Sequence, residues 1–324
     1  MRTITHTPAS LDEVKAAARR IAGHALRTPL VRLNVDDAPA EIHLKLENLQ
    51  PIGSFKLRGA LNTLAQMKPE ELAGGVWTAS AGNMAQGLAW AARQRGIPCA
   101  AVVPNTAPAA KLDAIKRLGA SVVMVSPEEF FEVFATRRRD GMSGTFVHAF
   151  SDSRMMAGNG TIALEILEEL PEVDTIIAPY GGGGLSCGIA AAARQVAPQV
   201  KVFACEPESA APLTRSLATG RASNFPMRRT FIDGAGGPRV FPEMFELAQQ
   251  LLHGALSVPV DEVAAAIRLL MERNRVVAEG AGALAVAAAL AGLAGEGRVC
   301  CIVSGGNIDA AVLAAILEGR VPDS

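Results

Sequence analysis

Short apolar runs alternate with stretches of helical periodicity along nearly the whole chain. Several of the runs are β-branched and apolar on both faces, which is typical of parallel strands that are covered on both sides. This alternation predicts an α/β fold built around mostly parallel sheets. The expected strands are residues 42–47, 75–79, 99–104, 121–125, 145–148, 174–179, 201–206, 255–258 and 298–304.

Local signals mark where the intervening helices begin and end. Ser10 followed by Glu13 predicts a capping box, and Pro108 suits the first turn of a helix that Gly119 ends. Residues 221–242 are rich in Gly, Pro and Arg without periodicity, so we expect a long functional or lid-like loop there. The remaining expected helices are residues 56–67, 83–95, 127–139, 155–169, 185–195, 261–274, 280–293 and 307–318.

Composition favours an enzyme of small molecules over a binder of nucleic acids or membranes. The 324 residues are 49% hydrophobic and carry a formal net charge of −1, with both signs interspersed. The N-terminal residues lack the apolar core of a signal peptide, and the apolar stretch 281–291 is too short to span a bilayer. We therefore expect a cytoplasmic protein.

The five cysteines form no Cys-x-x-Cys pair and have no histidine at ligand spacing. Neither a disulfide framework nor a zinc site is indicated, and we expect most of these residues to be buried thiols. They are Cys99, Cys187, Cys205, Cys300 and Cys301.

The first candidate for chemistry is Lys56, within Ser54-Phe55-Lys56-Leu57-Arg58-Gly59-Ala60. It follows a Pro/Gly loop and begins an expected helix, where desolvation and the helix terminus lower the pKa of an amine. A lysine with a lowered pKa is what Schiff-base chemistry needs. Taken alone, an ordinary solvated lysine explains this position as well.

Two further candidates are turns between a strand and a helix. Ser80-Ala81-Gly82-Asn83 offers backbone N–H groups to an anion such as a carboxylate, although a simple helix cap explains the same residues. Gly181-Gly182-Gly183-Gly184 lets the backbone approach a ligand closely and favours a phosphate cradle over a flexible hinge. No Gly-x-Gly-x-x-Gly run and no P-loop is present.

The fourth candidate is Ser304-Gly305-Gly306-Asn307, at the end of the last expected strand. A hydroxyl at the carboxyl end of such a strand faces the crevice where open α/β sheets bind ligands. An ordinary turn with an asparagine cap remains the alternative.

A competing pattern is Gly184-Leu185-Ser186-Cys187-Gly188, which matches the nucleophile elbow of serine hydrolases. A hydrolase would also need an acid and a downstream histidine. His253 is the only histidine after Ser186, with Glu206 or Asp233 as the acid. This alternative leaves Lys56 and Ser304 without a role.

Together, the four candidate motifs resemble the fold-type II pyridoxal-phosphate enzymes, in the branch of threonine/serine dehydratases and serine racemases within the tryptophan synthase β-like superfamily. The resemblance extends from about Leu11 to about Asp309. It implies two three-layer α/β domains with the cofactor in the cleft between them. The implied large domain is residues 1–73 and 151–324, and residues 74–150 form a small mobile domain. Supporting segments are residues 103–108, 157–165 and 206–208.

The resemblance also implies roles for individual residues. Lys56 would hold pyridoxal 5'-phosphate and remove the α-proton of the substrate, with Phe55 beside the ring. Asn83 would donate to the phenolic oxygen, and Ser304 would face the pyridine nitrogen. The implied phosphate contacts are Gly181, Gly182, Gly183, Gly184 and Leu185. The implied substrate contacts are Ser80, Ala81, Gly82, Asn83 and Met84.

A neutral hydroxyl facing the pyridine nitrogen makes the ring a weaker electron sink than a carboxylate would, which favours β-elimination. The implied activity is a lyase that dehydrates and deaminates a β-hydroxy amino acid, as threonine and serine dehydratases (ammonia-lyases) do in amino-acid catabolism. The products would be a 2-oxo acid and ammonia. Phenylserine and 3-hydroxyaspartate remain open as substrates, and so do racemisation and an inert cofactor carrier.

Four features separate this chain from relatives of the same branch. Ala81 stands where serine racemases carry a serine, which disfavours racemisation, and Met84 replaces a histidine, either for a bulkier substrate or as a packing change. Pro212 stands about where a carboxylate would join Glu206 in a divalent-metal site, which leaves that site in doubt. The chain ends after the last expected helix, so we expect no isoleucine-responsive regulatory domain. A homodimer is expected from the resemblance.

Overall fold

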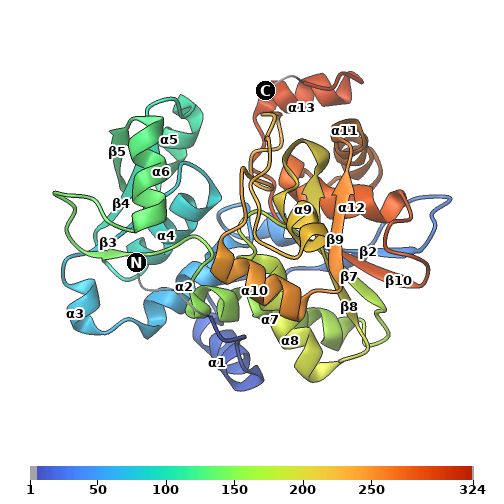
Figure 1. Ribbon diagram of the computed structural model, residues 1–324, viewed down its shortest axis with the longest axis horizontal. Helices are drawn as coiled ribbons and strands as arrows, with labels where there is room; N and C mark the ends of the chain where they lie inside the picture. The colour runs from blue at the N-terminus through green and yellow to red at the C-terminus, as the bar shows by residue number, and fades with distance from the viewer. Residues whose placement is uncertain (1–5, 323–324) are drawn as a thin grey trace.

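The computed structural model describes residues 6–322 and contains two sheets, each with helices around it (Figure 1). The described chain has ten strands and thirteen α-helices, which alternate over most of its length, as the apolar pattern predicts. The α/β fold with mostly parallel sheets is therefore confirmed.

The larger sheet has six strands in the order β1-β2-β10-β7-β8-β9. All neighbours are parallel except β1 and β2. Strand β10 lies between β2 and β7, so the last strand of the chain completes the middle of this sheet. The bounds are β1 Leu30–Arg32, β2 Glu41–Lys45, β7 Thr175–Pro179, β8 Lys201–Pro207, β9 Gly254–Val258 and β10 Arg298–Ile302.

The smaller sheet has four parallel strands in the order β5-β4-β3-β6. It lies on the opposite side of the molecule from the larger sheet, with α2 between the two (Figure 1). The division into a large and a mobile small domain remains a prediction. The bounds are β3 Val76–Ala79, β4 Cys99–Pro104, β5 Ser121–Val125 and β6 Thr145–Phe146.

The helices follow the expected order, and their ends follow local chemistry. Ser10 accepts a hydrogen bond from the Glu13 N–H while the Glu13 carboxylate accepts one from the Ser10 N–H, so the capping box is present. The helix bounds are α1 Leu11–Ile21, α2 Lys56–Gln66, α3 Pro69–Leu72, α4 Asn83–Arg93, α5 Ala109–Arg117, α6 Pro127–Thr136, α7 Ser153–Glu169, α8 Gly184–Val196, α9 Pro212–Thr219, α10 Pro242–Leu251, α11 Val260–Leu269, α12 Gly280–Leu290 and α13 Ala310–Leu317. Short single turns lie at Glu47–Leu49, Glu208–Ala210 and Leu270–Asn274.

The apolar stretch near the C-terminal end of the chain forms α12, whose residues from Gly280 to Ala289 are all buried. A helix that is apolar on every side belongs inside a protein. Among the described residues, no helix is both long and apolar enough to cross a membrane. All five cysteines are buried free thiols, as expected.

Sequence reasoning missed four elements: β1, α3, α9 and α10. Strand β1 and helix α3 span only three and four residues, too few for a periodic signal. Helix α10 begins at Pro242, the residue at which the expected loop ends. Residues between α9 and α10 are irregular, apart from an isolated bridge between Asn224 and Arg239, as expected.

Candidate functional site

Lys56 is the first residue of α2, and the turn before it is joined to the end of β10. The Phe55 N–H donates to the Ser304 carbonyl at 3.0 Å, and Ser54 forms a bridge with Gly305. Gly53 adopts a φ of +73°, a left-handed conformation that favours glycine and lets the chain turn into the helix. The sequence therefore brings two distant motifs, around Lys56 and around Ser304, side by side.

The Lys56 amine is held inside the site. Its Nζ donates to the Ala149 carbonyl at 3.0 Å and lies 5.0 Å from the centroid of the Phe55 ring. Burial lowers the pKa of Lys56 to about 8, although the nearby Glu279 carboxyl acts in the opposite direction. An amine in this range is partly neutral near physiological pH, as a nucleophilic or proton-accepting lysine must be.

The glycine turn forms the second wall of the site, between β7 and α8. Gly183 has a φ of +90° and precedes the first residue of α8, and no described side chain caps this helix. A Cβ on Gly182 or on Gly184 would overlap Phe150. The bare N-terminus of α8 therefore presents its backbone N–H groups with no side chain in the way, as a phosphate site requires.

The segment Ala149–Phe150 joins Lys56 to the glycine turn. Ala149 accepts the hydrogen bond from Lys56, while the Phe150 ring packs under Gly182. Asn159 of α7 also donates to the Gly184 carbonyl at 3.1 Å, which fixes the turn from behind. The lysine and the glycine cradle thus face one site, although Lys56 and Gly181 are 125 positions apart in the sequence.

Three buried polar atoms on these segments have no hydrogen-bond partner among the described residues: Ser54 Oγ, His148 Nε2 and Tyr180 Oη. Burying such groups without a partner is costly. The buried amine and the uncapped glycine turn together fit a phosphorylated aldehyde such as pyridoxal 5'-phosphate.

Asn83 begins α4 and reaches into the same site, where its side-chain Nδ2 donates to Glu279 at 2.7 Å. Ser304 is 2% exposed and lies two residues after the end of strand β10. A Cβ on Gly305 would lie 3.3 Å from Asn83 Nδ2, which places the turn after β10 against Asn83. The structure therefore gathers Phe55, Lys56, Asn83 and Ser304 around one position.

The expected substrate loop lies between β3 and α4. Ser80, Ala81 and Gly82 are partly exposed, and the Ser80 hydroxyl accepts a hydrogen bond from the Gly82 N–H at 3.2 Å. Met84, by contrast, is 2% exposed and belongs to the main hydrophobic core. This burial agrees with Met84 as a packing change. The substrate contacts of the loop remain predictions.

Glu279 is the main site residue that sequence reasoning missed. It precedes α12, is 6% exposed, and carries a carboxyl group whose pKa is raised to about 8 by burial and by the Asp233 carboxylate. Hydrogen bonding from Asn83 and the positive charges of Lys111 and Lys56 act in the opposite direction. A lone glutamate before an alanine-rich helix gives no sequence signal, because its partners lie in distant segments.

The hydrolase alternative is wrong. Ser186 is fully buried, and its hydroxyl donates to the Gly183 carbonyl at 3.3 Å, within the first turn of α8. A nucleophile elbow would instead expose the serine at the turn itself. His253 accepts a hydrogen bond from the Val202 N–H, and Asp233 pairs with Lys111, so the expected partners are occupied elsewhere.

Glu206 caps a helix. Its carboxylate accepts hydrogen bonds from the Leu213 and Thr214 N–H groups at 2.9 and 2.8 Å, at the start of α9. Burial raises the pKa of Glu206 to about 7, against the effect of these hydrogen bonds. Within residues 6–322, no group of three or more His, Cys, Asp or Glu side chains is placed to hold a metal ion.

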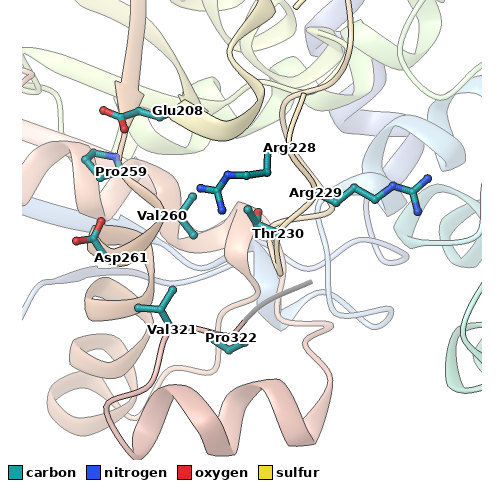
Figure 2. Close-up of a pocket in the computed structure, with 9 residues that line it drawn as sticks. All are labelled: Glu208, Arg228, Arg229, Thr230, Pro259, Val260, Asp261, Val321 and Pro322. Carbon is teal, nitrogen blue, oxygen red and sulfur yellow. The ribbon is translucent and has the colours of Figure 1, made fainter. Parts of the chain in front are cut away.

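A separate surface cavity of about 540 Å³ contains none of the expected site residues. Figure 2 shows Arg228 pointing into it and Arg229 pointing away. A second cavity, of about 440 Å³, is lined in part by Gly53 and Asn307, which belong to the turns before Lys56 and after β10. The first cavity is lined by Glu208, Arg228, Arg229, Thr230, Pro259, Val260, Asp261, Val321 and Pro322.

Comparisons with known proteins agree with this geometry. Residues 21–305 match the model of the family described as "Pyridoxal-phosphate dependent enzyme". The chain is 40% identical to an L-threonine ammonia-lyase of Thermotoga maritima, over 95% of this chain and 78% of that protein. It is 36% identical to the catabolic L-threonine dehydratase TdcB of Escherichia coli, over 93% and 94%. Maize serine racemase superposes with a TM-score of 0.88 at 32% identity, over 97% and 98%.

Proposed function

Since the chain belongs to the family of pyridoxal-phosphate-dependent enzymes and is like the threonine ammonia-lyases, we propose that it converts a β-hydroxy amino acid, threonine or serine by default, to a 2-oxo acid and ammonia. The observation that carries this proposal is the Lys56 amine. It donates to the Ala149 carbonyl beside the Phe55 ring, and Phe150, the residue after Ala149, packs against the uncapped glycine turn. The fold-type II family assignment and the cofactor, pyridoxal 5'-phosphate, follow from the family match.

In this proposal each wall of the site binds one part of the cofactor. The N–H groups from Gly181 to Leu185 bind the phosphate, and Phe55 packs beside the ring. Asn83 donates to the phenolic oxygen, and the Ser304 hydroxyl faces the ring nitrogen. When bound, pyridoxal phosphate supplies an electron sink that acidifies the α-C–H bond of an amino acid.

The residues of the chain then have two tasks. Lys56 takes the α-proton, for which a pKa lowered to about 8 is suited. The loop from Ser80 to Met84 binds the substrate carboxylate through its backbone N–H groups. The substrate loses its α-proton and β-hydroxyl as water, and a water molecule returns when ammonia is released, so the atoms balance.

Ala81 supports elimination over racemisation. Racemisation needs a proton donor on the face of the substrate opposite Lys56, and the methyl group of Ala81 has no proton to give. Phenylserine and 3-hydroxyaspartate remain alternative substrates. Racemisation is tested by chiral analysis of the substrate that remains after partial turnover.

The decisive experiment compares the wild-type protein with Lys56→Ala and with Lys15→Ala, which removes an exposed lysine from α1. Absorbance spectra are recorded with pyridoxal phosphate, and 2-oxo acid release is measured from L-threonine, L-serine, L-phenylserine and 3-hydroxyaspartate. We expect a cofactor band near the visible edge and 2-oxo acid release in wild type and Lys15→Ala only. A band that persists in Lys56→Ala would refute the assignment of Lys56.

Closure of residues 74–150 over the substrate is part of the same proposal. Two ion pairs support it, Lys111 with Asp233 and Arg137 with Glu243 at 3.5 Å, because each joins this segment to the rest of the chain. Amide hydrogen exchange in residues 80–87 should slow when a substrate analogue binds. Equal exchange with and without the analogue would count against closure. The expected homodimer also remains a prediction, which sedimentation can test.

A further inference from the structure

The Asn83 side chain is held at both ends by residues that the proposed function does not use. Asn307 Nδ2 donates to Asn83 Oδ1 at 2.7 Å, and Asn83 Nδ2 donates to Glu279 Oε1 at 2.7 Å. Asn307 Nδ2 also donates to the Ile52 carbonyl at 2.8 Å. The three side chains and this carbonyl form one chain of hydrogen bonds.

The Ile52 carbonyl fixes which groups donate and which accept along this chain of hydrogen bonds. A backbone carbonyl can only accept a hydrogen bond, so the atom of Asn307 that faces Ile52 must be its amide nitrogen. The same nitrogen faces Asn83, which must therefore present its oxygen to Asn307 and its nitrogen to Glu279. Amide orientations are often ambiguous, but here the sequence of donors and acceptors leaves one assignment.

The network lies directly against the proposed cofactor position, and its carboxyl end is buried. Glu279 is 6% exposed, and a Cβ on Gly305 would overlap its Oε1. Gly305 follows Ser304, and the charge of Lys56 influences the Glu279 carboxyl. Because the Asn83 Nδ2 group carries two hydrogens and Glu279 accepts one, the second remains to be donated to a ligand.

The network also joins the two sheet units, by which we mean the larger and the smaller sheet, each with the helices around it. Asn83 begins α4, which contacts β3 and β4 of the smaller sheet, whereas Glu279 precedes α12, which lies against the larger sheet. Asn307 lies in the turn after β10, a strand of the larger sheet. The orientation of Asn83 is therefore set by residues across the junction between the units.

We propose that Glu279 and Asn307 are positioning residues that hold the Asn83 amide with an N–H directed at the phenolic oxygen of the cofactor. This inference rests on the cofactor site of the proposed function. An Asn83 turned by half a rotation would direct its carbonyl oxygen at the phenolic oxygen and replace a charge-assisted hydrogen bond with repulsion. Glu279 and Asn307 act through Asn83 alone.

The test uses substitutions that separate hydrogen bonding from shape. Glu279→Gln keeps an acceptor oxygen, Glu279→Leu removes it, and Asn307→Ala removes the donor at a partly exposed position. We measure the affinity for pyridoxal phosphate by equilibrium dialysis, and the pH midpoint of the absorbance band of the bound cofactor. Glu279→Leu and Asn307→Ala should each bind the cofactor about tenfold more weakly and shift the midpoint, while Glu279→Gln stays within about threefold of wild type.

A double-mutant cycle distinguishes positioning from general destabilisation. In an Asn83→Ala background, Glu279→Leu should weaken cofactor binding no further, because the residue through which it acts is gone. Glu206→Leu is the matched control, since it removes another buried carboxyl whose pKa is raised, in the same sheet unit and at a helix cap. It should lower the unfolding midpoint without moving the absorbance band.

The outcomes can be told apart. Unchanged affinity and an unchanged band in both Glu279→Leu and Asn307→Ala would overturn the inference, and so would a full additional loss in the Asn83→Ala background. If the wild-type band does not depend on Lys56, the proposed function fails and the inference fails with it. If Glu279→Leu does not fold, Asn307→Ala with its own Asn83→Ala cycle decides the question.

Discussion

Replacing Arg58 by methionine should destabilise the protein strongly, because Arg58 neutralises two carboxylates at a buried position. Its guanidinium is 1% exposed and donates to both Glu47 oxygens at 2.8 Å and to Glu165 Oε2 at 2.9 Å. Glu47 is fully buried. The substitution leaves Glu47 without its ion-pair partner, whereas Glu165 keeps Lys45 at 2.8 Å. Breaking a buried pair in this way costs about 3–5 kcal/mol.

This loss of unfolding free energy can be expressed as a decrease in the melting temperature, Tm. For 324 residues, the unfolding entropy is roughly 0.7 kcal/mol per kelvin, so a loss of about 4 kcal/mol lowers Tm by about 6 °C. Thermal and urea unfolding of the cofactor-free protein measure it. Arg27→Met is the matched control, because Arg27 also contacts two carboxylates, Glu168 and Glu169, but is half exposed. It should cost less than about 1 kcal/mol.

The pH dependence of the Arg58 effect has a definite sign. Burial alone would raise the pKa of Glu47, but the charge and hydrogen bonds of Arg58 outweigh it and lower that pKa below its ordinary value. A lowered folded pKa gives stability above the unfolded pKa, and this stability is lost as pH falls through the folded pKa. The difference in unfolding free energy between wild type and Arg58→Met should therefore become smaller in acid. A cost at pH 7 no larger than that of Arg27→Met would refute the reasoning.

Three further predictions follow from the site and its surroundings. Gly182→Ala should abolish tight pyridoxal phosphate binding in equilibrium dialysis, because the added Cβ overlaps Phe150; unchanged binding would contradict the cradle. Glu206 has a folded pKa of about 7, above its ordinary value, so its contribution to stability is present at low pH and lost as pH rises through about 7; urea midpoints at pH 5 and 8 should differ less in Glu206→Gln, and parallel shifts would argue against it. In cofactor-free protein, trinitrobenzenesulfonate should label Lys56 with a pH midpoint of about 8, and a midpoint like that of exposed Lys15 would exclude a lowered pKa.

The fold could be predicted from the sequence wherever the signal was local and repeated. Buried parallel strands such as β7 are mostly apolar and are buried over their whole length, and the capping box at Ser10 lies within four consecutive residues. Strand β1 was missed because it spans three residues, and its pairing with β2 depends on tertiary contacts. The order of the strands could not be obtained from periodicity, which carries no information about neighbours.

The candidate site, like the fold, could be predicted only where its residues stand in local motifs. Lys56 and the glycine turn stand in compact motifs, and the structure places them around one site, as those motifs together suggest. The contacts of Glu279 join residues 196 positions apart, and those of Arg58 with Glu165 join residues 107 apart, so no local pattern records them. In the sequence Arg58 was only one residue of a motif, whereas the structure shows that it shares a buried ion-pair cluster with Lys45, Glu47 and Glu165.

The position of β10 in the larger sheet has a consequence for the newly made chain. Strand β2 pairs with β1 and β10 only. The edge of β2 that faces away from β1 therefore stays unpaired until β10, about 250 residues further along the chain, has been made. At about 5–20 residues per second, the ribosome needs tens of seconds to supply it. The smaller sheet, whose four strands lie between Val76 and Phe146, has all its pairing partners much sooner. The segment of Ser304 and Gly305 therefore emerges after the other segments of the proposed cofactor site, so the nascent chain can complete that site only after Gly305 has been translated.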